Sequence, residues 1–295
     1  MEKIKKIDIH AHAVGIKEIP PSSITIRAEE LLDIYEKIDV EKAVLLPIVS
    51  PEGQTFLMPN ESIIEIVERY PDKFYWFCNV DPRTAPNSAT TDLSKYLNYY
   101  KEKGARGVGE LTSNLYFDDP KMDNLFYHCE ECEMPIIFHV SPAPGVNYGA
   151  VDEIGLPRLE KMLKKHPKLK FIGHSQPFWA EMSADITEEF RNRYPKGKVT
   201  DGRIAKLLRE YDNLYCDLSA GSGANAIMRD PEYAESFLNE FADRILYGCD
   251  ICEIGPSFPY KFSDFLENMR ESGTLKEENY RKICRENAEK ILGLK

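Results

Sequence analysis

Short apolar segments alternate with longer amphipathic stretches along the whole chain. Near-continuous apolar segments of this kind are typical of strands that are covered on both faces, as in a parallel sheet. The stretches between them repeat apolar residues every three or four positions, which is the spacing of one face of a helix. We therefore predict strands at Lys5–His12, Lys42–Ile48, Phe74–Val80, Ala105–Leu111, Pro135–Val140, Lys170–Ser175, Asn213–Ser219 and Arg244–Asp250.

The predicted helices show the same regularity. In one of them Leu159, Met162 and Leu163 fall on one face, with lysines opposite. We expect helices at Glu29–Ile38, Glu61–Tyr70, Leu93–Lys103, Leu159–His166 and Ile204–Tyr211. A last amphipathic stretch, Glu277–Leu292, is expected to form an extra helix against the outside of the domain.

The strands recur roughly every 30 to 40 residues, which is the length of one strand–helix–strand unit. Eight such units in 295 residues match a (β/α)8 barrel, the TIM barrel. A doubly wound sheet is the competing architecture, but no Gly-x-Gly-x-x-Gly turn follows the first strand. The sequence thus predicts one α/β domain over residues 1–295, with its functional face at the carboxyl ends of the strands.

Charge and composition restrict the partners of the chain. A net charge of -11 and a pI near 5.2 argue against binding to nucleic acids or anionic membranes. We find no apolar segment of membrane-spanning length and no apolar leader before the first strand. Seven scattered cysteines are typical of reduced thiols. We expect a cytoplasmic protein with a small-molecule partner. Whether it forms a homodimer is left open, because Tyr99, Tyr100, Phe265 and Met269 suit either a dimer contact or packing on the barrel.

Side chains that bind metals close five of the predicted strands. The chain has six histidines, and four of them stand at strand ends. The strand-end residues are His10, His12, Glu110, His139, His174 and Asp250. Because the carboxyl ends of barrel strands meet on one rim, we expect these side chains to lie close together. Alternate residues of a strand share a face, so His10 and His12 point the same way.

Imidazole and carboxylate groups are the ligands that zinc and related divalent metals take in proteins. A catalytic ion keeps one position open for water and lowers the pKa of that water towards about 7. Asp250 follows the last strand, next to the first strand in a closed barrel, and is placed to accept the proton. The competing interpretation, isolated core histidines, requires four of them to reach strand ends by chance.

With these residues in place, the chain resembles the amidohydrolase superfamily. The resemblance rests on His10–Ala11–His12 after the first strand, a histidine after strands five and six, and an aspartate after strand eight. The segments LEKMLKKHPKLKFIGH (residues 159–174) and LYGCD (residues 246–250) resemble the branch that includes aminocarboxymuconate semialdehyde decarboxylase. This resemblance implies a distorted TIM barrel with one or two divalent ions, most often zinc, with manganese or iron(II) as alternatives.

The resemblance also implies roles for the strand-end residues. We expect His10, His12, His139 and Asp250 to bind metal. His174 would bind a second ion or donate a hydrogen bond to the substrate.

Glu110 bears on the number of ions. Many two-metal members carry a carboxylated lysine at this place, and a glutamate could bridge two ions without modification. Its alternative role is to hold a histidine in one tautomer. Members of the decarboxylase-like branch usually bind a single metal.

Candidate substrate contacts lie in the loops of the same face. The connection Gln176–Val199 is long, and its Phe178 and Trp179 would either line an apolar pocket or seal the barrel. An arginine in these loops would bind a substrate carboxylate through two parallel hydrogen bonds. The candidates are Arg27, Arg83 and, as first choice, Arg229.

These expectations leave three functions. The first is hydrolysis of a small-molecule amide, ester or lactone by metal-activated water, with Asp250 moving the proton. The second is metal-dependent, non-oxidative decarboxylation of an aromatic or unsaturated carboxylic acid. The third, from another class, is a non-catalytic metal-binding barrel. Glu110 favours hydrolysis, whereas the segment at residues 159–174 favours decarboxylation.

Overall fold

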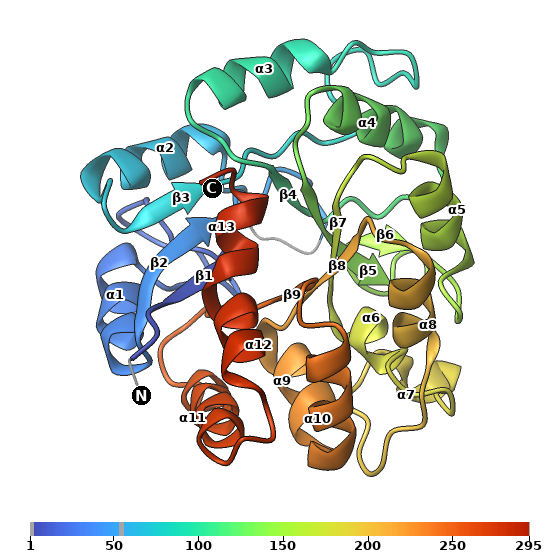
Figure 1. The fold of residues 1–295 in the computed structure, drawn as a ribbon. Helices are drawn as coiled ribbons and strands as arrows, with labels where there is room; N and C mark the ends of the chain where they lie inside the picture. Colours follow the sequence, from blue (N-terminus) through green and yellow to red (C-terminus); the bar gives the residue numbers. More distant parts are fainter. Residues whose placement is uncertain (1–2, 53–55, 295) are drawn as a thin grey trace.

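The computed structural model describes residues 3–52 and 56–294 and shows parallel strands ringed by helices (Figure 1). Eight strands follow the predicted order, and one further short strand, β6, pairs with β5. The strands are β1 (Lys6–Ala11), β2 (Val40–Leu45), β3 (Phe74–Trp76), β4 (Val108–Leu111), β5 (Ile136–Ser141), β6 (Ala150–Val151), β7 (Phe171–His174), β8 (Leu214–Asp217) and β9 (Ile245–Leu246). The predicted domain limits, residues 1 and 295, lie outside the described residues.

Backbone hydrogen bonds close the strands into a barrel. All pairs are parallel, in the orders β1–β2–β3 and β4–β5–β7–β8–β9. The two sheets meet where the Cys78 N–H donates to the Gly107 carbonyl, at 2.9 Å. On the other side, the Ile9 N–H donates to the Tyr247 carbonyl, at 3.0 Å. The predicted TIM barrel is confirmed, and its distortion lies in the short strands β3 and β9.

Helices surround the barrel, and their sequences carry the expected signals. The carboxylate of Asp119 accepts a hydrogen bond from the Lys121 N–H and so caps the helix that begins there. Leu159, Met162 and Leu163 form the buried face of α5, as their spacing predicts. The helices are α1 (Ala28–Lys37), α2 (Asn60–Arg69), α3 (Ser94–Glu102), α4 (Pro120–Glu131), α5 (Pro157–Lys165), α6 (Gln176–Ala180), α7 (Glu188–Arg191), α8 (Arg203–Glu210), α9 (Ala220–Met228), α10 (Pro231–Glu240), α11 (Phe258–Glu271), α12 (Glu277–Arg281), the π-helix η1 (Lys282–Glu286) and α13 (Asn287–Ile291).

The C-terminal stretch differs from its predicted position on the outside of the domain. It covers the amino ends of the strands, and in Figure 1 α13 lies over the middle of the ring of strands. Ala288, Ile291 and Leu292 join the cluster inside the barrel that contains Ile7 and Val44. The barrel interior is apolar at this end, so covering it removes apolar surface from water.

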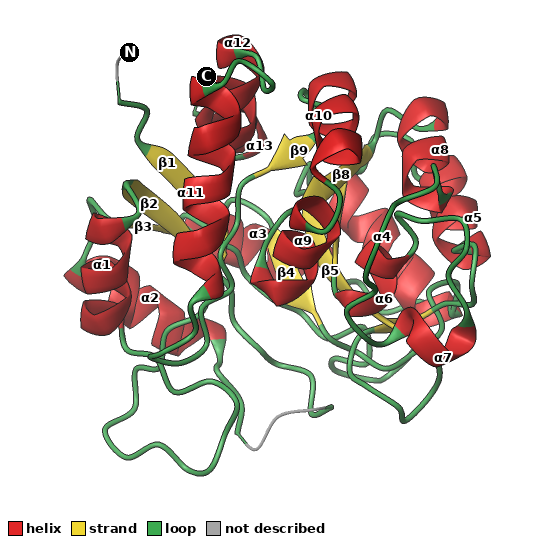
Figure 2. Ribbon diagram, turned by 90° about the horizontal axis from the view of Figure 1, so that it is seen from below, coloured by secondary structure: helices red, strands yellow, loops and turns green. Residues whose placement is uncertain are grey.

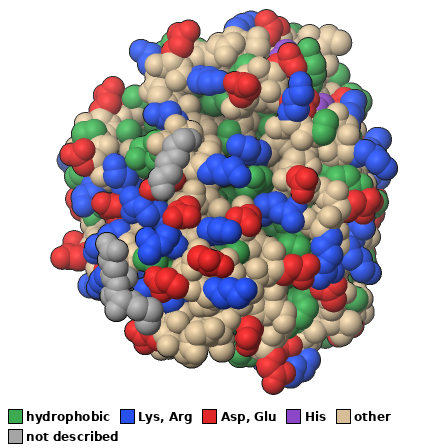
Figure 3. All heavy atoms as spheres, viewed as in Figure 1, with side chains coloured by type: hydrophobic (Ala, Val, Ile, Leu, Met, Phe, Trp, Pro, Cys, Tyr) green, Lys and Arg blue, Asp and Glu red, His purple; other side chains and the backbone are tan. Residues whose placement is uncertain are grey.

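The two ends of the barrel are therefore different. Figure 2 shows α12 and α13 at one end of the strands and long loops at the other. Basic and acidic side chains are interspersed over the face seen in Figure 3. The carboxyl ends of the strands are left to the loops, where the sequence places the candidate site. Within the described residues, no helix combines the length and apolar character needed to cross a membrane.

Candidate metal centre

The polar residues predicted at strand ends lie together at the carboxyl end of the barrel. They are His10 and His12 at the end of β1, Glu110 in β4, His139 in β5, His174 in β7 and Asp250 after β9. The histidines and Glu110 are buried, whereas the side chain of Asp250 is 16% exposed. Asp250 is therefore the member of the set that faces solvent.

A shift in the register of β1 turns its histidines towards the centre. Ile9 packs inside the barrel, whereas Ala11 belongs to the main hydrophobic core, which lies between the strands and the surrounding helices. Regular alternation from Ile9 would place His10 on the outer face, but the pairing with β2 shifts between Asp8 and Ala11. As a result, His10 and His12 share the inner face.

The donor atoms have the separations of one coordination shell. The Nε2 atoms of His10 and His12 are 3.2 Å apart, and Glu110 Oε2 lies 3.6 and 3.5 Å from them. Asp250 Oδ1 lies 3.8 Å from His10 Nε2 and 3.5 Å from His12 Nε2. Ligands held about 2.1 Å from a tetrahedral zinc ion are about 3.4 Å apart. These side chains therefore have the spacing that a divalent ion requires.

The donors form two overlapping groups, each within 4.8 Å. The groups are His10, His12 and Asp250, and His10, Glu110 and His174. His174 Nε2 also lies 3.6 Å from Asp250 Oδ2, which joins the two groups. His139 belongs to neither group, although its ring is centred 5.5 Å from the ring of His174.

Backbone carbonyls hold two of the histidines. Nδ1 of His12 lies 3.0 Å from the Leu46 carbonyl, and Nδ1 of His139 lies 3.1 Å from the Val140 carbonyl. Because a carbonyl only accepts, Nδ1 carries the proton and Nε2 is free to bind metal. Gly149 packs on His139 with φ +103°, and a Cβ there would lie 2.4 Å from the His139 carbonyl oxygen.

Asp217 and Ser219, which were missed in the sequence, hold the other two histidines. Asp217 Oδ2 lies 2.6 Å from His10 Nδ1 and accepts from the Ser219 hydroxyl at 2.8 Å. Because this hydroxyl gives its only proton to the carboxylate, it accepts from His174 Nδ1, 2.9 Å away. Nδ1 of His10 and of His174 is therefore the donor to these partners, and Nε2 is the atom through which each ring would bind metal. Asp217 closes β8 as the other site residues close their strands, and that position is the signal that identifies it.

The electrostatics of the site fit a bound cation. Burial lowers the pKa of His174 to about 3, so its imidazole is neutral. Burial also opposes a charge on His10, but Asp250 and Asp217 outweigh it and raise the pKa of His10 well above its usual value. One imidazolium cannot balance three carboxylates. In addition, Glu110 Oε1 is buried and has no hydrogen-bond partner among the described residues, which is costly unless a cation occupies the centre.

A family model described as amidohydrolase matches residues 7–294, nearly the whole chain. The chain belongs to the amidohydrolase family. The resemblance inferred from the strand-end residues is thus confirmed, and with it the expectation of an enzyme. No curated protein matches this amidohydrolase.

Solved structures of the same fold include decarboxylases and hydrolases. An amidohydrolase from Burkholderia multivorans is 14% identical, with a TM-score of 0.64 over 98% of this chain and 99% of that one. A dihydroxybenzoic acid decarboxylase from Polaromonas, with bound manganese, is 16% identical, with a TM-score of 0.56 over 98% and 97%. A probable 2-pyrone-4,6-dicarboxylic acid hydrolase from Acinetobacter baumannii is 12% identical, with a TM-score of 0.56 over 98% and 100%. At these identities the likeness establishes the fold.

Phe178 and Trp179 of this amidohydrolase lie in the main hydrophobic core. The ring of Phe178 packs edge-on against Phe138, and Trp179 Nε1 donates to the Asp217 carbonyl at 2.9 Å. These positions agree with the second of the two expected roles, in which Phe178 and Trp179 seal the barrel. We therefore assign them no contact with substrate. Their burial follows from α6, which packs them against β5 and β7.

The three candidate arginines differ in what they contact. Arg27 donates to two backbone carbonyls, and Arg83 is paired with Glu52 and Asp81. In contrast, Nε and Nη2 of Arg229 are buried and have no hydrogen-bond partner within residues 3–52 and 56–294. Of the three, Arg229 alone retains buried donors that a ligand could satisfy.

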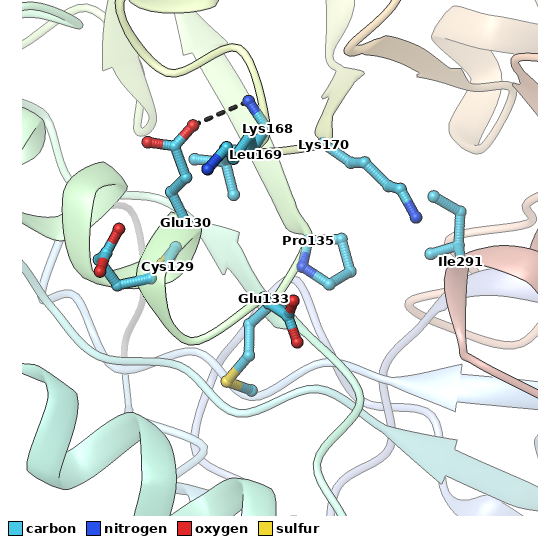
Figure 4. Close-up of a pocket in the computed structure, with 10 residues that line it drawn as sticks. Cys129, Glu130, Glu133, Pro135, Lys168, Leu169, Lys170 and Ile291 are labelled. Atoms are coloured by element: carbon cyan, nitrogen blue, oxygen red, sulfur yellow. Dashed lines mark hydrogen bonds between the residues drawn. The ribbon is translucent and has the colours of Figure 1, made fainter.

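A cavity of about 430 Å³ lies at the other end of this amidohydrolase (Figure 4). Its lining comes from the residues before β5 and β7 and from α13, and it mixes acidic and basic side chains. The Lys168 N–H donates to the carboxylate of Glu130 at 2.8 Å there. Because this end of a TIM barrel serves stability, we assign the cavity no part in the metal centre.

Proposed function

We propose that this amidohydrolase hydrolyses a small-molecule amide, ester or lactone at a two-ion centre. The position of Glu110 carries the proposal. Its Oε2 atom faces the Nε2 atoms of His10 and His12, while its buried Oε1 atom has no hydrogen-bond partner in the described part of the chain. A carboxylate so placed would be a shared ligand of two cations, with His10, His12 and His174 as further ligands.

The chain supplies a group for each proton movement. When bound, divalent ions at this centre would lower the pKa of water towards about 7 and polarise a carbonyl. Asp250 has the most exposed carboxylate, at 16% against 5% for Glu110 and 0% for Asp217. We assign Asp250 to accept the proton of the attacking water and to return it to the leaving group. His174 has no proton on Nε2, so we assign it as a metal ligand and not as a donor to substrate.

Decarboxylation of an aromatic or unsaturated carboxylic acid is the alternative. His10 belongs to both donor groups, an arrangement that also suits a single ion. A decarboxylase with bound manganese shares the fold. In this reaction Asp250 would deliver a proton to the carbon from which CO₂ leaves. A non-catalytic metal-binding barrel would use Asp250 as a ligand only.

Zinc is the ion that we propose, with manganese or iron(II) as alternatives, because imidazole nitrogens outnumber the carboxylates that face them.

We also propose a cytoplasmic location, because all seven cysteines are free. A homodimer stays a prediction. Of the residues considered for it, Tyr99 is 52% exposed, whereas Met269 packs in the core.

Turnover by an Asp250→Asn variant tests the proposed function. Two substrate panels would be assayed, one of amides, esters and lactones and one of aromatic and unsaturated acids monitored for CO₂. We expect hydrolysis by the wild type, a loss of at least about 100-fold in Asp250→Asn with metal retained, and no change in Glu253→Gln, an exposed neighbour. CO₂ release would instead identify a decarboxylase, and retained metal without activity on either panel would favour the non-catalytic barrel.

A further inference from the structure

An open cavity of about 600 Å³ adjoins the loop that follows β7. Its lining comes from residues 183, 185–187, 190 and 193–196 and from Arg229 at the end of α9. None of the metal-centre residues lines it. Tyr194 connects the two regions, since its hydroxyl lies 3.4 Å from the amide nitrogen of Gln176, two residues after His174. The cavity is thus a separate space on the catalytic side of the barrel.

The cavity concentrates unpaired positive charge. Its cations are Arg193, Lys196 and Arg229, and in the part of the chain that the structure describes no carboxylate oxygen lies within 4.0 Å of them. Ten of the 14 arginines do have such a partner, so this group is unusual in an acidic chain. Asp185 is the one carboxylate of the lining, and it accepts from the Ser183 hydroxyl at 2.5 Å.

Two guanidinium nitrogens of Arg229, Nε and Nη2, are buried, and they have no acceptor among the residues that the structure describes. These two atoms form the edge of a guanidinium that binds a carboxylate through two parallel hydrogen bonds. Elsewhere in the chain Arg158 and Arg209 use the same two atoms to bind Glu153 and Glu240, at 2.6 to 2.9 Å. A carboxylate or phosphate group in the cavity would supply Arg229 with the acceptors that it lacks.

The lining also contains apolar side chains. The side chains of Phe190 and Tyr194 are 46% and 48% exposed, and Ile186 and Pro195 lie beside them. Apolar surface of this kind is stabilised when a ligand covers it. Three cations against the carboxylate of Asp185 leave a charge of about two units for that ligand to balance.

We propose that this cavity binds a small organic dianion with an aromatic or branched apolar body, at a site separate from the metal centre. Arg229 holds one anionic group through Nε and Nη2, and Arg193 and Lys196 hold the other. The apolar body lies against Phe190 and Tyr194. The proposal concerns binding and does not depend on which reaction the metal centre performs.

Calorimetric titration of the metal-loaded protein with isophthalate tests the proposal. We expect the Kd to rise at least about tenfold in Arg229→Gln and in Arg193→Gln. Arg106→Gln is the matched control, because Arg106 also forms no ion pair with the residues that the structure describes but precedes β4, away from the cavity lining. The isophthalate Kd of this variant should differ from that of the wild type by less than about twofold. Arg193 is exposed, so its variant keeps the test valid if Arg229→Gln folds poorly. Inorganic phosphate should bind more weakly than isophthalate, because it has no apolar body.

Removal of the metal separates this site from the metal centre. Isophthalate binding that persists in metal-depleted protein and is lost in the cavity variants supports the proposal. Binding that disappears with the metal and ignores both substitutions would place isophthalate at the metal centre and overturn it. Absence of binding to the wild type up to about 10 mM would overturn it as well.

Discussion

Replacing Asp217 with asparagine should weaken metal binding with little change in shape. Asp217 is fully buried, and its Oδ2 atom holds His10 Nδ1 at 2.6 Å and the Ser219 hydroxyl at 2.8 Å. Its Oδ1 atom accepts from the Ser219 N–H at 2.9 Å. The carboxylate therefore accepts at both oxygens, and an amide can accept at only one.

Either orientation of the amide creates a mismatch. If the NH₂ group takes the place of Oδ2, it donates to His10 Nδ1 and forces the proton onto Nε2, the atom that faces the metal. If it takes the place of Oδ1, it meets the Ser219 N–H, donor against donor. A buried polar group without a matching partner lowers the free energy of unfolding by about 1 to 3 kcal/mol. Loss of the hydrogen bond that orients a metal-binding histidine lowers metal affinity about 10- to 100-fold. We expect the metal Kd of Asp217→Asn to rise by that factor.

Competition with a chromophoric chelator would measure the metal Kd, and urea unfolding of the metal-free protein would measure stability. Cys216→Ala is the control, because Cys216 directly precedes Asp217 in β8 but packs in the main hydrophobic core. It should lower the free energy of unfolding by roughly 1 to 2 kcal/mol without changing the metal Kd. Equal metal affinity in wild type and Asp217→Asn, within about twofold, would refute the assigned role of Asp217.

Three further substitutions test other parts of the structure. In Gly149→Ala the new Cβ would lie 2.4 Å from the His139 carbonyl oxygen and 2.8 Å from His139 Nδ1. We therefore expect metal analysis to show reduced occupancy, together with a loss of at least about 2 kcal/mol in the free energy of unfolding; unchanged occupancy would remove His139 from the centre. Phe178→Ala should cost about 3 to 5 kcal/mol in urea unfolding, because the ring is fully buried, while the metal Kd stays the same; a large change in Kd would contradict its placement in the core. Burial raises the pKa of Asp81, but hydrogen bonds from Arg83 and a serine outweigh it and leave the pKa below its usual value. Arg83→Met should therefore cost about 2 kcal/mol at pH 7, and the difference from wild type should shrink as the pH falls below about 4, where the carboxylate becomes protonated; a difference that grows in acid would contradict this sign.

The strand order and the strand-end residues could be predicted because each depends on a local pattern. Apolar segments such as Pro135–Val140 are read directly as buried strands, and the histidine that follows the segment at residues 170–173 marks the rim. The register shift in β1 could not be predicted, because Ile9 and His10 are both buried and the strand shows no simple alternation.

Other features depend on contacts between distant parts of the chain. Asp217 contacts His10 although the two residues are 207 positions apart in the sequence, so no local pattern predicts the pair. The C-terminal helix has the same amphipathic pattern whether it lies beside the barrel or over its end, and only the apolar interior around Ile7 selects the end. Phe178 likewise carries no sign of whether its ring faces substrate or core.

The metal content of the wild-type protein and of Glu110→Ala, measured by elemental analysis after reconstitution, tests the central claim most directly. We predict about two ions per chain in the wild type and about one in the variant, with Glu253→Gln like the wild type. About one ion in all three proteins would favour a mononuclear centre and the decarboxylase alternative. No bound metal in any of them would contradict the metal centre itself.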